Sequence, residues 1–338
     1  MNIKGIENMQ KTNRQYNYGQ ITTKGLSAAL ILTLALTAVG CGESGTPELK
    51  DAIHKTAAYE QETVASPEVG SLGGEWTVLA LARSEEEVAD SYFEKYRANL
   101  EKYVKEKDGV LSENRYTEYA RVTLALTAIG GDPTDIGGYD LEKNLEDFDT
   151  VTAQGINGAI FALLALNAEG ETDGALQEKY LDYILEREKT DGGFSMDDNS
   201  GQADVDITAM ALQSLKPYHD EQKIQETLDR GVKFLADAQD ADGGYTAYGE
   251  KSSESVAQTI LALSTLGVDC NDDERFQKDG KGLYDTLMQY YQKDGSFAHT
   301  VDEKEGNPMA TDQALCALVS YERMLDNKNT FYNMTDHR

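Results

Sequence analysis

Two aspartates, Asp204 and Asp206, stand one residue apart directly ahead of an apolar segment that begins at Ile207. A carboxylic acid that is held by neighbouring hydrogen bonds in a dry pocket can act as a general acid. Asp206 is therefore a candidate catalytic proton donor, with Asp204 beside it. Acids that begin a helix also cap free backbone N–H groups and complement the helix dipole, which explains the same two residues without catalysis.

Further carboxylates stand near the start of other apolar segments: Glu75, Glu118, Glu254 and Asp312. When the segments are aligned on the alanine of a shared Ala-Leu pair, Glu75 and Asp312 match Asp206, and Glu118 matches Asp204. Glu254 lies one position out of register. The alignment predicts that these carboxylates share one end of a helical barrel. A pair such as Asp206 and Asp312 could there protonate a glycosidic oxygen and activate water, as in a glycoside hydrolase.

Aromatic residues gather at or near the turns that lead into the apolar segments: Trp76, Tyr116, Tyr119, Phe194, Tyr245, Tyr248 and Phe297. Such rings can stack on a sugar, a corrin or a terpenoid. Phe194, Tyr245 and Phe297 recur at one place in successive repeats, so we expect them to wedge the repeats together. Trp76, Tyr116, Tyr119 and Tyr248, with the four carboxylates, are the candidate ligand-binding residues.

Residues that bind metals are few. The loop Asp197-Asp198-Asn199-Ser200-Gly201 offers oxygen ligands for Ca²⁺, although its glycine comes one place too early for an EF-hand, and a solvated loop explains it equally well. The four histidines and three cysteines show no zinc-site spacing. No other cofactor is expected. Cys270 and Cys316 either form one disulfide or remain thiols, and the apolar surroundings of Cys316 favour a buried thiol.

Six apolar segments, with anchor alanines at positions 80, 125, 165, 211, 262 and 317, recur about every 47 residues, which suits a repeat of two helices. They are apolar nearly all round and are expected to be buried helices. Charge-rich amphipathic helices are expected between them, over residues 49–64, 84–107, 174–189, 221–239 and 281–292. Ser84 and Glu87 predict a capping box for the second of these. Asp-Gly turns follow four of them, at Gly109, Gly192, Gly243 and Gly295. The pattern predicts an all-α ring of six inner and six outer helices.

The turns QDADGGY (residues 239–245) and QKDGSF (292–297) resemble the Q-x-x-D-G-x-aromatic turns of the terpene cyclase and prenyltransferase repeat superfamily. Residues 130–167, 203–218 and 307–325 are similar to bacterial surface proteins with a prenyltransferase-like toroid. The resemblance implies an (α/α)6 toroid, a fold also shared with intrinsic-factor-like corrinoid carriers. Those carriers hold their ligand against a second, β-rich domain, for which the residues after Leu325 are too few.

The segment DVDITA (residues 204–209) resembles the D-x-D-D-T-A motif of class II terpene cyclases. In that family the middle aspartate protonates an alkene, and Asp206 takes its place here. Ile207 stands where the motif has its last aspartate. The resemblance also implies a second helical domain beside the site, for which this chain has no room.

Residues 25–40 carry no charge, follow a basic stretch and end directly before Cys41. This arrangement is typical of a secretory signal, and Ala38-Val39-Gly40-Cys41 resembles the lipobox of bacterial lipoproteins. We expect a signal peptide over 1–40, a lipidated tether over 41–48, the toroid over 49–325 and a tail over 326–338. The protein would then lie outside the cytoplasm, anchored to the cell membrane through Cys41. An uncleaved anchor is the alternative.

The chain has 338 residues, with 31 Lys and Arg against 60 Asp and Glu, for a net charge of -29. This charge argues against nucleic-acid binding and against docking on anionic lipid. Together these features predict a cell-surface binding or interaction module for a terpenoid, corrinoid, glycan or envelope-protein ligand, rather than an enzyme. The alternatives are a cyclase or isomerase that uses Asp206 as its acid, and a glycoside hydrolase.

Overall fold

The computed structural model describes residues 46–153, 155–196, 201–247 and 249–336, which belong to one compact unit spanning 45–338. The expected signal peptide, Cys41, Tyr248 and residues 197–200 of the expected calcium loop lie outside the described residues. None of the helices in these ranges is long and apolar enough to cross a membrane.

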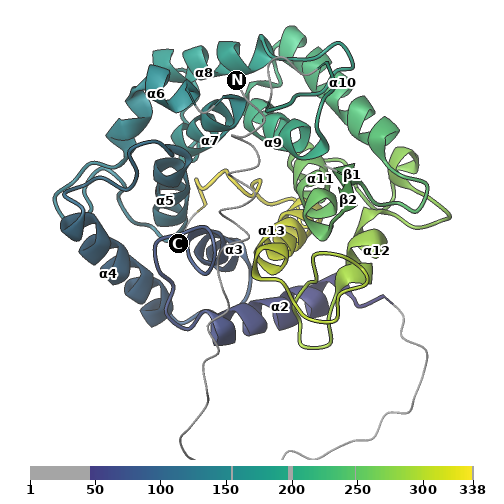
Figure 1. Ribbon diagram of the computed structural model, residues 1–338, viewed down its shortest axis with the longest axis horizontal. Coiled ribbons are helices and arrows are strands. Elements are labelled where there is room, and N and C mark those ends of the chain that lie inside the picture. The colour runs from purple at the N-terminus through teal and green to yellow at the C-terminus, as the bar shows by residue number, and fades with distance from the viewer. Residues whose placement is uncertain (1–45, 154, 197–200, 248, 337–338) are drawn as a thin grey trace, which may run out of the picture. The chain divides into compact units, whose positions relative to one another are not determined.

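Six inner helices form a closed ring, as Figure 1 shows. They are α3 (Glu75–Arg83), α5 (Thr117–Ala128), α7 (Ile156–Leu166), α9 (Val205–Leu215), α11 (Ser253–Leu266) and α13 (Pro308–Leu325). Each packs on the next, and α13 packs on α3. Every predicted apolar segment lies in one of these helices, whose residues are buried on nearly all sides because each has two inner neighbours and an outer one.

Six outer helices surround the ring: α2 (Leu49–Thr63), α4 (Asp90–Glu106), α6 (Phe148–Thr152), α8 (Ala175–Leu185), α10 (Gln222–Ala238) and α12 (Leu283–Leu287). The short ones, α6 and α12, are extended by the 3-10 turns η1 (Glu142–Glu146) and η4 (Met288–Tyr290). The other short elements are η2 (Lys216–Tyr218), η3 (Glu274–Phe276) and the hairpin of β1 (Thr246–Ala247) and β2 (Glu250–Lys251). The predicted ring of six inner and six outer helices is confirmed.

The Asp-Gly turns behave as predicted. Their glycines, Gly109, Gly192, Gly243 and Gly295, all have positive φ. Phe194, Tyr245 and Phe297, which follow three of the turns, are fully buried between repeats. The backbone N–H of Phe194 donates to Thr208 Oγ1 at 2.8 Å, and that of Phe297 donates to Thr311 Oγ1 at 3.0 Å. Each of these two turns is thereby fixed to the inner helix that follows it.

The ring is closed by the same contact that joins two successive repeats, in which an Asp-Gly turn packs against the next outer helix. The turn at Gly192 packs against Arg230 of the next outer helix, α10, and the turn at Gly295 packs against Lys55 of α2. Thr56 Oγ1 donates to the Gly295 carbonyl at 2.8 Å. Helix α2, the first outer helix in sequence, is therefore the next outer helix in space after the last repeat.

The capping box predicted at Ser84 and Glu87 is wrong. Ser84 follows α3, and its hydroxyl donates to the Leu81 carbonyl at 2.8 Å. The next helix, α4, begins only at Asp90, after N-cap Ala89. Ser84 thus ends the inner helix instead of beginning the outer one.

The segment after α13 crosses the ring at the C-terminal ends of the inner helices. The Met334 N–H donates to the carbonyl of Ala168, just beyond α7, at 2.7 Å. Phe331 and Met334 are fully buried. Because α7 and α13 stand opposite each other in the ring, this tail spans its middle, where Figure 1 draws it in yellow.

Candidate functional site

One face of the inner helices remains half-exposed while the positions around it are buried. Counted from the N-caps, it carries the second residue of each inner helix and the sixth residue of α7, α9, α11 and α13. In α5 it also carries Arg121, whereas the sixth residue of α3, Ala80, is fully buried. Outer helices and inner neighbours cover the other sides, so this face is turned toward the ring axis. We call it the axial face: Trp76, Glu118, Arg121, Asn157, Phe161, Asp206, Met210, Glu254, Gln258, Met309 and Gln313; Phe161 is the most buried of these.

Asp206 lies on this face, whereas Asp204 is the N-cap of α9. The Asp204 carboxylate accepts from the Ile207 N–H at 2.9 Å, so it fulfils the predicted capping role. Asp206 is the second residue of α9 and hydrogen-bonds to Ser255 of α11. Its Oδ1 atom is buried and has no partner among the described residues. Burial, and next the negative charge of Asp204, raise the pKa of Asp206 to about 7. Capping therefore does not explain Asp206.

A chain of side-chain amides runs around one half of the ring. Gln213 Nε2 donates to Gln258 Oε1 at 3.2 Å, and Gln258 Nε2 donates to Gln313 Oε1 at 3.3 Å, which links α9, α11 and α13. On the other half, the rings of Trp76 and Phe161 lie 5.7 Å apart. The axial face therefore combines an aromatic side with an amide side.

The Glu75 carboxylate, at the first residue of α3, is buried, and its hydrogen-bond partners come from the preceding loop, from α4 and from α5. It accepts from the Gly70 N–H at 3.0 Å, the Tyr96 hydroxyl at 3.3 Å and Arg121 Nε at 3.4 Å. Burial raises the pKa of Glu75 to about 7, against the opposing effect of Arg121. These contacts tie α3 to α4 and α5, and the Glu75 side chain is buried away from the axial face.

Asp312 is buried one turn inside α13, where it accepts from Thr77 Oγ1 at 2.6 Å. Glu60 of α2 lies beside it. Burial and the charge of its partner raise the pKa of Glu60, and burial does the same for Asp312, so the pair retains a proton at neutral pH. Glu60 Oε1 and the Tyr92 hydroxyl, both buried here, have no hydrogen-bond partner within the described ranges.

The predicted match between Asp206 and Asp312 is wrong. The anchor alanine lies seven residues after N-cap Asp204 in α9 but ten after Asn307 in α13. A slip of three residues is nearly one helical turn, so the apolar pattern survives it. By the caps, the residue that corresponds to Asp206 is Glu254, the second residue of α11.

Asp206 and Asp312 are not brought together. They lie on α9 and α13 with α11 between them, and inner helices pack about 8–10 Å apart. No residue that influences the pKa of one carboxyl influences the other. A glycosidase pair requires carboxyl groups about 5–9.5 Å apart, so this pair does not support that alternative.

Tyr116, Tyr119 and Glu118 lie together at the start of α5. The Tyr119 hydroxyl accepts from the Leu111 N–H at 3.0 Å and donates to the Ser112 carbonyl at 3.2 Å, and its ring lies 5.2 Å from that of Tyr116. Glu118 pairs with Arg115 at 2.6 Å. These contacts hold the loop before α5. Tyr116 is its N-cap and Tyr119 is buried, so neither is on the axial face, whereas Glu118 is the second residue of α5 and lies on it.

Sequence reasoning missed several axial residues, including Asn157, Gln258 and Gln313. It also missed His299, whose Nδ1 lies 2.8 Å from Glu254 Oε2. The hydrogen bond with Glu254 raises the pKa of His299. Counting two and six residues from Ser252 and Asn307, which read as N-caps, would have found the glutamines.

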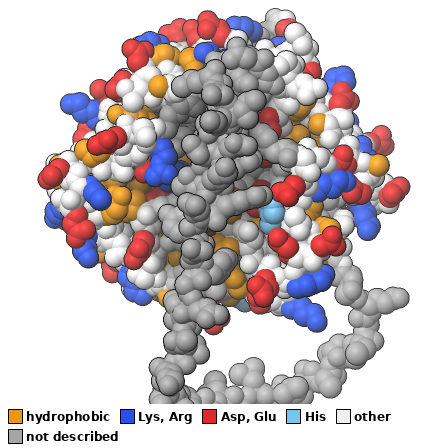
Figure 2. Space-filling model, in the orientation of Figure 1, with side chains coloured by type: hydrophobic (Ala, Val, Ile, Leu, Met, Phe, Trp, Pro, Cys, Tyr) orange, Lys and Arg blue, Asp and Glu red, His pale blue; other side chains and the backbone are white. Residues whose placement is uncertain are grey.

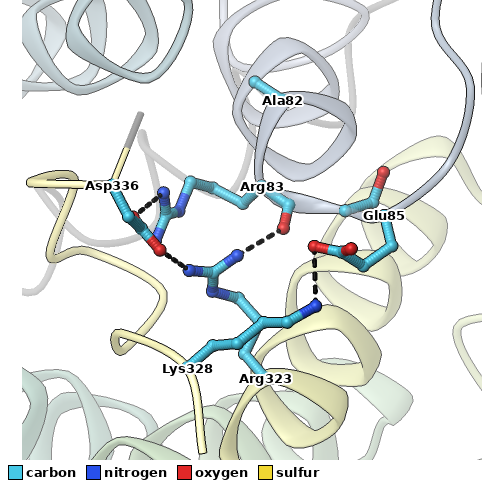
Figure 3. Close-up of a pocket in the computed structure, with 7 residues that line it drawn as sticks. Ala82, Arg83, Glu85, Arg323, Lys328 and Asp336 are labelled. Carbon is cyan, nitrogen blue, oxygen red and sulfur yellow. Dashed lines mark hydrogen bonds and ion pairs between the residues drawn. The ribbon is translucent and has the colours of Figure 1, made fainter. Parts of the chain in front are cut away.

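A hollow of about 390 Å³ lies at the C-terminal ends of the inner helices. It is lined by Ala82, Arg83, Ser84, Glu85, Arg323, Lys328 and Asp336. Figure 3 shows that ion pairs occupy its walls. Arg83 Nη1 lies 2.6 Å from Asp336, and Arg83 also donates to the carbonyls of Phe331, Asn333 and Thr330. The side chains that line the hollow therefore hold the segment after α13 in place.

The described part of the chain contains no group of three His, Cys, Asp or Glu side chains that could hold a metal ion. Cys270 and Cys316 are both buried free thiols, so they do not form the disulfide that the sequence left open. Figure 2 shows basic side chains scattered among acidic ones on the face it views.

The sequence model of the prenyltransferase alpha-alpha toroid domain matches residues 114–268 and 211–334. The two matches together span more than half of the chain. The chain belongs to this family. No curated protein sequence matches it.

Solved structures share the toroid. A type II terpene cyclase from Scytonema, MstE, in complex with geranylgeranyl dihydroxybenzoate, is 12% identical with a TM-score of 0.58 over 82% of this chain and 98% of its own. The unsaturated glucuronyl hydrolase of Bacillus sp. GL1 is 13% identical with a TM-score of 0.56 over 85% and 98%. Candida albicans protein geranylgeranyltransferase-I is 14% identical with a TM-score of 0.54 over 80% and 91%.

These identities show a common fold.

Proposed function

We propose that this toroid-family protein is an exported lipoprotein, tethered through Cys41, whose axial face binds a small-molecule or glycan ligand. The observation that supports binding is a pair of oxygen atoms at equivalent positions of neighbouring helices. Asn157 Oδ1 on α7 and Asp206 Oδ1 on α9 are buried and have no hydrogen-bond partner among the described residues. A buried polar atom without a partner costs about 1–3 kcal/mol, which a bound ligand can recover.

The single tryptophan of the chain tests the proposal, because Trp76 lies on the axial face. The purified full-length protein is titrated with corrinoids, polyprenyl alcohols and oligosaccharides, while tryptophan fluorescence and thermal unfolding are followed. A ligand at a hundred times its Kd stabilises by about 2.7 kcal/mol. One class should change both readouts. If no class changes either readout, ligand binding on the axial face is refuted, and an envelope protein becomes the partner to seek.

A second candidate function is acid-catalysed cyclisation or isomerisation of a polyprenoid by Asp206. It is favoured by one observation: burial raises the pKa of Asp206 to about 7, so the group retains a proton near neutral pH while its Oδ1 has no partner in the described chain. In this function Asp206→Asn abolishes turnover of a polyprenoid without loss of stability. In the binding function the wild type converts no polyprenoid, and Asp206→Asn still binds ligand.

The tether is tested separately from the toroid. With Cys41→Ser the protein should appear in the culture medium, because the acceptor of the lipid is lost. Retention of this variant in the membrane fraction would contradict the lipoprotein assignment and favour an uncleaved anchor.

A further inference from the structure

We infer that the ligand of the axial face is a neutral glycan, bound with a sugar ring against the aromatic side and its hydroxyls against the amide side. The inference rests on the proposed binding function and names its ligand class. It depends on three observations: the aromatic pair, the amide chain and the distribution of charge.

The two sides of the axial face match the two chemical aspects of a sugar. Trp76, the half-exposed member of the aromatic pair, offers a ring face on α3 on which the C–H face of a pyranose can stack, and the buried ring of Phe161 on α7 packs 5.7 Å from it. Gln258 and Gln313 offer amides that both donate and accept, as sugar hydroxyls do. The amides are already ordered by bonds to each other, so binding costs little side-chain entropy.

The same amides disfavour a polyprenyl ligand. A hydrocarbon laid along the axial face would exclude water from Gln258, Gln313 and Asn157 without supplying hydrogen bonds in return. Only Met210, Met309 and the aromatic pair on this face are suited to it. A glycan supplies those bonds, including partners for the buried oxygens of Asn157 and Asp206.

The charges favour a neutral sugar over a uronic acid. Arg121 is the one basic residue of the axial face as defined above, and its guanidinium is paired with Glu75. Glu254 is acidic, and the chain carries a net charge of -29. A carboxylated sugar would therefore meet repulsion, whereas hydroxyls would not.

The test follows Trp76 fluorescence in the full-length protein. The probes are cellohexaose, maltohexaose, chitohexaose, an oligoglucuronate and geranylgeraniol. We expect at least one neutral hexaose to change the emission in a saturable way, at least ten-fold more tightly than the oligoglucuronate and without any effect of geranylgeraniol. Gln313→Leu should weaken that binding at least ten-fold, because it removes one hydrogen-bonding group from the amide side.

The matched control is Gln225→Leu, which changes an exposed glutamine of α10 and should leave the affinity unchanged. Thermal unfolding shows whether Gln313→Leu is folded, and Gln313→Glu, which retains an acceptor, should bind more tightly than Gln313→Leu. A Trp76 response to geranylgeraniol alone would overturn the glycan class but leave binding on the axial face intact. Tighter binding of the oligoglucuronate would overturn neutrality. Silence of Trp76 toward every probe would overturn the inference, whereas the proposed function fails only if the corrinoid titration and thermal unfolding show no response either.

Discussion

Asp204 and Asp206 are separated by a single residue, yet α9 begins between them and gives them different environments. Asp204 remains outside the helix and accepts the Ile207 N–H, while Asp206 turns toward the ring axis. The acidic pair could be found from the sequence. Its division of roles could not, because it depends on the one residue at which the helix begins.

We predict opposite effects of substituting these two aspartates. Asp204→Ala should lower the free energy of unfolding by about 1 kcal/mol, because the helix loses its cap. Asp206→Asn should not destabilise, since asparagine resembles the protonated acid, and it should be more stable than the wild type at pH 8. Urea unfolding at pH 6 and pH 8 measures both variants. Equal destabilisation by the two would show that Asp206 also caps the helix.

The buried pair of Glu60 and Asp312 predicts how stability depends on pH. Burial raises the pKa of Glu60 and of Asp312, so the folded protein binds more protons than the unfolded chain. Stability from these groups is complete below their unfolded pKa values, near 4, and is lost as the pH rises through the folded values. The expected slope is a loss of about 1.4 kcal/mol per pH unit for each proton.

Glu60→Gln tests this prediction, because the amide cannot ionise. The variant should lose stability less steeply than the wild type between pH 5 and pH 8 in urea unfolding. Glu62→Gln, on the exposed side of the same helix, is the matched control and should keep the wild-type slope. A Glu60→Gln slope equal to that of the wild type would mean that the pair holds no extra proton.

At the scale of elements, the sequence predicted two of the long outer helices closely, whereas α4 begins at Asp90, six residues after its predicted start. The predicted 221–239 became Gln222–Ala238, and the predicted 49–64 became Leu49–Thr63. Both carry long amphipathic patterns. No helix was predicted for the region of α6, because one turn is too short to show a period. The sequence alignment matched Asp206 with Asp312 instead of with Glu254, because alignment on the anchor alanines does not detect a shift of three residues, which is nearly one helical turn.

The tail after α13 is an element that composition alone does not reveal, since its thirteen residues are mostly polar. We predict that Phe331→Ala destabilises by about 3–5 kcal/mol, because it empties a fully buried site in the middle of the ring. Lys328→Ala removes a partly exposed ion pair with Glu85 and should cost less than about 1 kcal/mol. Thermal unfolding compares them. A small effect of Phe331→Ala would show that the tail is dispensable.

At the scale of the whole ring, closure depends on Gly295. Its φ is +96°, and a Cβ there would lie 2.5 Å from the Lys55 carbonyl oxygen of α2. Gly295→Ala should therefore separate α2 from the last repeat and lower the unfolding temperature. Gly280 has φ +75° with nothing within 4 Å of a Cβ, so Gly280→Ala isolates the backbone cost of about 1–2 kcal/mol. Similar losses for the two variants in calorimetry would argue against a role of Gly295 in closure.

An open array of helical repeats must end on two capping repeats whose outer faces are polar. The ring described above has no such ends: α3 and α13, the first and last inner helices, are as buried as those between them. Removal of any one hairpin would therefore uncover two apolar helix sides at once. Unlike a solenoid, which can gain or lose repeats along its length, this protein cannot be shortened by a repeat and stay soluble.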